Sequence, residues 1–162
     1  MRPAMPLRVL VAGLALSLAT AFIGVAAGQP AQPVIPEEAV RKMMDLGLKN
    51  IQRALCDGFN QCAPATPQEL ENPPLSLDQA RAAIIVGARS AFAQWCGLDA
   101  NTRSVLPFLR QLRQSRLYDE RQIALMAVIH GIQQSITSDQ LKAKGACGDA
   151  MRKDLEAQLP GA

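Results

Sequence analysis

The sequence predicts an all-α fold in which four to five helices form a bundle stapled by two disulfides. Apolar residues recur every three or four positions in several segments, and capping residues precede most of these segments. No stretch combines strand alternation with an enrichment in β-branched residues. The chain has four cysteines, an even number that allows two disulfides.

Residues 1–27 have the layout of a secretory signal peptide. Arg2 and Arg8 give a basic start without acids, an apolar run follows from 9 to 23, and small residues come next. We expect cleavage after Ala27 or after Gly28, and a retained membrane anchor is the competing interpretation. A bacterial leader of this kind predicts a periplasmic protein with no stable membrane insertion once the signal is removed.

The exported part of the chain is almost neutral. Two of the 17 Lys and Arg residues lie in the leader, so 15 remain against 14 Asp and Glu. This balance gives no reason to expect a nucleic-acid partner. About 135 residues remain, which suits one domain. We expect a proline-rich spacer at 28–36 and a single helical domain at 37–162.

Apolar residues at helical spacing predict a first helix from Glu37 to Cys56. A long connection without periodicity follows from 57 to 75. Connections of this length in small domains are usually functional or held in place. Because Cys62 lies inside it, we expect a disulfide to hold it.

The second helix is predicted from Ser76 to Cys96. Ser76 and Gln79 form a capping box, and Gly97 is placed to end the helix in a left-handed conformation. Small side chains then repeat every four residues and predict close helix packing. They are Ala83, Gly87 and Ala91, with Ala127 and Gly131 as the expected matching row.

The third helix is predicted over 99–116, with a kink or restart at Pro107, because proline removes a backbone donor. The last two helices are expected to begin at Asp119 and at Thr137 or Ser138, and the final one to run to about Leu159.

The cysteines are expected to pair as Cys96 with Cys147 and Cys56 with Cys62. Short turns would make the second, third and fourth helices run up, down and up, which brings the end of the second near the end of the fourth. The pairs Cys56–Cys147 and Cys62–Cys96 stay open as alternatives. An oxidised Cys96 cannot act as a nucleophile with His130, the single histidine, and we expect no enzyme.

Two sets of residues are candidate contacts. Met126 and His130 lie four apart, with Met43 or Met44 on another helix, and could serve a ligand, haem or metal carrier. The expected role of these residues is nevertheless core packing, without a cofactor. The third helix is rich in arginine and has no acid between Asp99 and Asp119. It could receive an acidic partner or the anionic surface of the envelope, or it could be a solvated face balanced by acids such as Glu69 and Glu71. Its arginines are Arg103, Arg110, Arg113 and Arg116.

The stretches WCGLD and ERQIALMAVIHG, with a second cysteine before a closing amphipathic helix, resemble small exported helical proteins of Gram-negative bacteria that have no assigned activity. The resemblance covers about 76–159. A signal, a helical domain and a disulfide between distant helices are also similar to the acid-stress periplasmic chaperones, which implies an envelope-stress or chaperone-like role. We therefore expect a non-enzymatic periplasmic binding protein whose partner is another envelope protein.

Overall fold

The structure is a computed structural model that describes residues 35–56 and 58–159. The predicted signal peptide, its cleavage sites and almost all of the spacer lie outside these residues. Within them the fold is all-α, as predicted, with six α-helices and two disulfides. None of the helices in this part of the chain combines the length and the apolar character that crossing a membrane requires.

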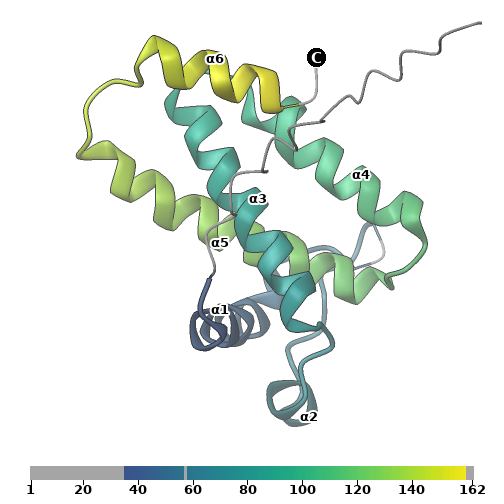
Figure 1. Cartoon of the computed structure of the whole chain (residues 1–162). Coiled ribbons are helices and arrows are strands. Elements are labelled where there is room, and N and C mark those ends of the chain that lie inside the picture. Colours follow the sequence, from purple (N-terminus) through teal and green to yellow (C-terminus); the bar gives the residue numbers. More distant parts are fainter. Residues whose placement is uncertain (1–34, 57, 160–162) are drawn as a thin grey trace, which may run out of the picture. The chain divides into compact units, whose positions relative to one another are not determined.

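Helices α3 (Leu77–Trp95) and α5 (Glu120–Lys142) lie side by side and form the centre of the domain (Figure 1). Gly87 of α3 has no side chain, which lets the two backbones come close. A Cβ atom added at Gly87 would lie 2.5 Å from the carbonyl oxygen of His130. The predicted small-residue packing is therefore real at Gly87.

The matching row on α5 was predicted wrongly. Gly131 is exposed, and a Cβ atom added there would have nothing within 4 Å. Ala127 and Gly131 instead line a groove with Asn50 and Ala54. The helical phase of α5 turns His130 toward α3 and its neighbour Gly131 away from it, because adjacent residues point in different directions.

Helix α1 (Glu37–Lys49) packs on α5 through a second close approach. A Cβ atom at Gly47 would lie 2.8 Å from Cγ1 of Ile129. The helix ends earlier than predicted, because the side-chain amide of Asn50 donates to the carbonyl of Leu46 at 2.8 Å. A single 3₁₀ turn, η1 (Ile51–Arg53), follows and buries Ile51 completely.

The long connection contains a short helix, α2 (Pro67–Glu71), that the sequence analysis missed. Thr66 and Glu69 form its capping box. Glu69 also pairs with Arg121 at the start of α5, and Arg121 donates to the carbonyls of Ala63 at 3.0 Å and Pro64 at 3.3 Å. The Arg121 guanidinium thus holds the connection in place, and Glu69 pairs with Arg121 and not with the arginines of the predicted third helix. The salt bridge keeps the pKa of Glu69 at about 2.

The predicted third helix has two parts, a π-helical turn η2 (Asn101–Val105) and helix α4 (Leu106–Ser115). The backbone amide of Leu106 donates to the carbonyl of Asn101, five residues back. Pro107 explains this arrangement, since its ring would collide with the carbonyl of Arg103 in a regular α-helix. The predicted restart at Pro107 is confirmed.

The predicted helix start at Thr137 or Ser138 was wrong. Helix α5 continues through this point to Lys142, and α6 (Asp149–Gln158) follows after a loop. Thr137 is buried inside α5, where its hydroxyl accepts a hydrogen bond from Gln133 at 2.9 Å. The hydroxyl is satisfied within the helix, so the residue does not act as a cap.

Glycine-to-alanine substitutions at Gly87 and Gly131 of the central helices should change the free energy of unfolding in opposite directions. Gly87→Ala places a methyl group against a backbone carbonyl and should lower the free energy of unfolding by about 1–3 kcal/mol. Gly131→Ala meets open space and should raise it by about 0.5–1 kcal/mol, because alanine is the better helix former. Urea unfolding of the two variants measures both effects, and a stable Gly87→Ala variant would contradict the close approach.

Candidate functional site

Cys96 is part of a disulfide with Cys147, as predicted, and their Cα atoms are 4.9 Å apart. The bond joins the end of α3 to the segment before α6. Beside it, Trp95 donates from Nε1 to the carbonyl of Gly145 at 2.8 Å. Among the described residues there is no free cysteine. Cys96 therefore fastens α6 to the end of α3 and offers no nucleophile.

His130 lies at the centre of a buried hydrogen-bonded group. Its Nε2 atom is 2.9 Å from the hydroxyl of Ser90, and the Ser104 hydroxyl is 2.7 Å from the same oxygen. The Ser90 hydroxyl also donates to the carbonyl of Val86 at 3.0 Å. Phe108 stacks on the imidazole, with 5.8 Å between the ring centroids. The group thus joins α3, η2, α4 and α5.

The hydrogen-bond geometry assigns the protons of this group. Ser90 has one hydroxyl proton, which it gives to Val86, so it must accept from both His130 and Ser104 if all three contacts are hydrogen bonds. The Nε2 atom of His130 then carries a proton. A nitrogen that already carries a proton cannot take one from Ser90. Ser90 and His130 therefore do not form a nucleophile with its general base.

Met126 and His130 are both buried, with 2% and 3% of their surfaces exposed. The Nε2 atom of His130 is occupied by Ser90, so binding haem or a metal through it would break that hydrogen bond. No group of three or more His, Cys, Asp or Glu side chains in the described part of the chain is arranged to hold a metal ion. Within this part, His130 stabilises the junction of the helices.

The four predicted contact arginines do not act alike. The Arg103 guanidinium donates to the carbonyl of Glu156 at 3.2 Å and so reaches toward α6. Arg110, Arg113 and Arg116 are exposed. Arg116 ends α4 in a left-handed conformation with φ 54°. The solvent-facing part of the predicted arginine surface is therefore formed by these three residues.

The second disulfide, Cys56–Cys62, also forms as predicted and closes a loop after η1. Two backbone hydrogen bonds brace the loop, from Cys56 to the carbonyl of Asn60 at 3.0 Å and from Cys62 to that of Ala54 at 2.9 Å. Phe59 is carried by this loop with 92% of its surface exposed. A large aromatic residue is thus presented to solvent on a braced loop.

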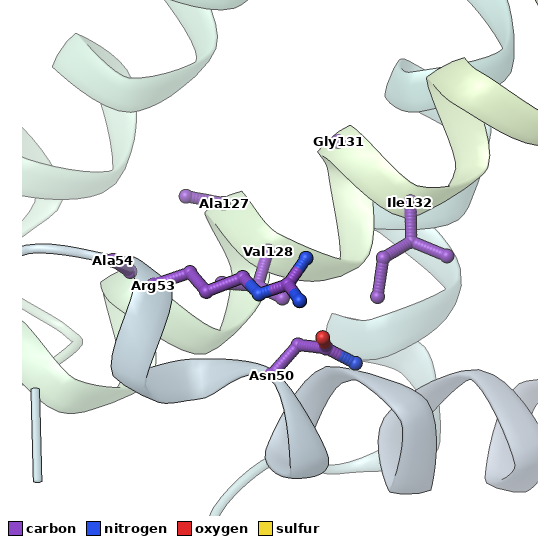
Figure 2. A pocket seen from close by; sticks show the side chains of 7 residues that line it. All are labelled: Asn50, Arg53, Ala54, Ala127, Val128, Gly131 and Ile132. Atoms are coloured by element: carbon purple, nitrogen blue, oxygen red, sulfur yellow. The ribbon is translucent and has the colours of Figure 1, made fainter. Parts of the chain in front are cut away.

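A groove opens next to this loop, between η1 and α5 (Figure 2). Its volume is about 320 Å³. Alanine, valine and isoleucine side chains form most of its lining, and one guanidinium group lies over it. The lining residues are Asn50, Arg53, Ala54, Ala127, Val128, Gly131 and Ile132.

Sequence reasoning missed both Phe59 and Arg53. The signal for Phe59 was an aromatic residue between two closely spaced cysteines, in a segment treated only as a connection. Arg53 falls near the carboxyl end of the predicted first helix, where a cation suits the helix dipole and calls for no further role. Only the break after α1 places it over the face of α5.

No family model, no curated protein and no solved structure matches this chain. The resemblance to exported helical proteins and acid-stress chaperones therefore stays a prediction.

Burial lowers the pKa of His130 from 6.5 to about 4. Folding therefore favours the neutral ring. This preference adds its full amount to the free energy of unfolding at pH values above the pKa of the unfolded chain, 6.5. As the pH falls from about 6.5 to about 4, the unfolded chain takes up a proton first, and the fold should lose about 3 kcal/mol of unfolding free energy.

The part of this loss that falls between pH 7 and pH 5.5 is measured by urea unfolding, because this range lies above the ordinary pKa of Glu69, 4.5, and that carboxylate stays charged in both the folded and the unfolded chain. A His130→Gln variant should show a flatter pH dependence in this window, whatever its absolute stability. An equal slope for both proteins would contradict the assignment of the loss to His130.

Proposed function

We propose that this chain is a non-catalytic periplasmic binding protein that recognises another protein of the cell envelope. The observation that carries the proposal is Phe59, an aromatic side chain 92% exposed on a loop closed by a disulfide. Aromatic residues, phenylalanine among them, are enriched in protein–protein interfaces. The periplasmic location rests on the leader and the two disulfides.

The brace around Phe59 supports its role as an anchor. The disulfide and the backbone pairing of Leu55 with Gln61 restrict the loop before any partner arrives. A restricted loop loses less conformational entropy when it binds, so more of the contact energy appears as affinity. Leu55, half exposed beside the bridge, adds apolar surface next to the anchor.

A Phe59→Ser variant tests this proposal. Because the ring is exposed, the substitution should leave the melting temperature unchanged. The proteins captured from a periplasmic extract by the immobilised chain should nevertheless fall at least tenfold, as expected for an interface anchor. Leu117→Ser removes another exposed apolar residue, 76% accessible and outside the loop, and is the matched control.

If Phe59→Ser and Leu117→Ser both lose the same captured protein, or if both retain it, Phe59 is not the anchor. A Cys56→Ser, Cys62→Ser double variant should weaken capture while Phe59 is still present.

A chaperone-like activity in acid is a second candidate, and His130 is the observation that favours it. Protonation places a charge between α3, α4 and α5, where its burial is unfavourable. Loosening of these helices would expose apolar residues of the core. We expect the wild-type protein to suppress aggregation of a denatured client at pH 3 and not at pH 7, measured by light scattering. Equal suppression at both pH values would contradict an acid-triggered activity.

A further inference from the structure

The groove between η1 and α5 combines an apolar lining with one cationic side chain, that of Arg53. Val128 and Ile132 of α5 form its aliphatic wall, and Gly131 leaves open space, since a Cβ atom there meets nothing within 4 Å. In Figure 2 the Arg53 side chain extends over the groove, and its guanidinium lies near Asn50. The amide of Asn50 donates to the carbonyl of Leu46. Arg53 thus supplies the charged N–H donors of this groove.

Arg53 differs from the other cations of this region. Arg41, Lys42 and Lys49 each pair with an acid four residues earlier in α1. Four residues before Arg53 stands Lys49, a like charge, and among the described residues no ion pair involves Arg53; Asp57, the acid four residues after it, lies outside the described residues. Its guanidinium keeps its capacity for a carboxylate, which it can bind through two parallel hydrogen bonds.

We propose that this groove binds a small aliphatic monocarboxylate, with the carboxylate on Arg53 and the alkyl chain along Val128 and Ile132. An apolar body with one anionic end matches an apolar wall with one cation. The volume of about 320 Å³ is at the lower end of small-molecule sites, which span roughly 300–1,000 Å³. A free, short-chain acid is therefore the occupant that fits, and longer chains would extend beyond the lined space.

This site goes beyond the proposed function and does not depend on it. Phe59 is not among the residues that line the groove. Phe59→Ser should therefore leave carboxylate binding unchanged, and substitutions in the groove provide a separate test.

Titration of the purified protein with octanoate at pH 7, followed by ¹H–¹⁵N NMR, tests the proposal. The amide signals of Asn50, Val128 and Gly131 should shift in a saturable manner. From hexanoate to octanoate the affinity should rise by up to about fourfold for each methylene that becomes buried. Octan-1-ol, which has the chain without the charge, should bind at least tenfold more weakly.

Substitutions in the groove separate the contribution of the Arg53 charge from that of the apolar space beside Gly131. Arg53→Gln should reduce octanoate affinity at least tenfold, and Arg53→Lys should retain part of it. Gly131→Leu should fill the groove and block binding, while Gly131→Ala leaves most of the space. Arg110→Gln removes an exposed arginine elsewhere and should bind octanoate like the wild type. Melting temperatures confirm that each variant is folded.

Three results would overturn the proposal. They are octanoate binding that Arg53→Gln does not weaken, octan-1-ol binding as tightly as octanoate, and a peptide with a carboxyl-terminal leucine that binds in the groove when octanoate does not. The last result would assign the groove to a protein segment.

Discussion

The close approach of α3 and α5 is the constraint on which the other packing contacts depend. At Gly87 the absence of a side chain brings the two helices together, and the carbonyl of His130 occupies the space that a methyl group would need. This proximity places Ser90, one turn further along α3, within hydrogen-bond reach of the His130 ring. A larger residue at position 87 would separate the helices and leave buried polar groups without partners, so packing and hydrogen bonding support each other.

The remaining elements attach around this pair. Helix α1 packs against α5 at Gly47, and Arg121 ties the long connection to the start of α5. At the other end of α3, the Cys96–Cys147 disulfide and a second apolar cluster with Leu155 and Leu159 hold α6. Among the described residues, the braced loop with Phe59, the groove lined by Arg53 and the exposed arginines of α4 face solvent around this frame.

The sequence predicted the fold where local signals and packing agree. The capping box at Ser76, the glycine after Cys96 and the two disulfide pairs are local or topological features, and the structure confirms them. The predicted end of the first helix at Cys56 and the predicted helix start at Thr137 or Ser138 were wrong, because side-chain hydrogen bonds between residues four apart decided the boundaries. Asn50 ends α1 through its own side chain, and Thr137 finds a partner inside α5. The groove could not be predicted, because it requires η1 to turn Arg53 toward α5.

The π-helical turn before α4 is in effect a helix with one additional residue. Each residue of a regular α-helix advances by about 100° around the axis, so the extra one changes the directions of side chains on either side of it. Ser104, inside this turn, reaches Ser90, and Phe108, after it, reaches His130. A regular helix could not place both side chains in the same way. Loss of a single residue between 101 and 105 would restore regular spacing and rotate one contact away from the core. This segment should therefore tolerate many substitutions on its exposed side but no change in length.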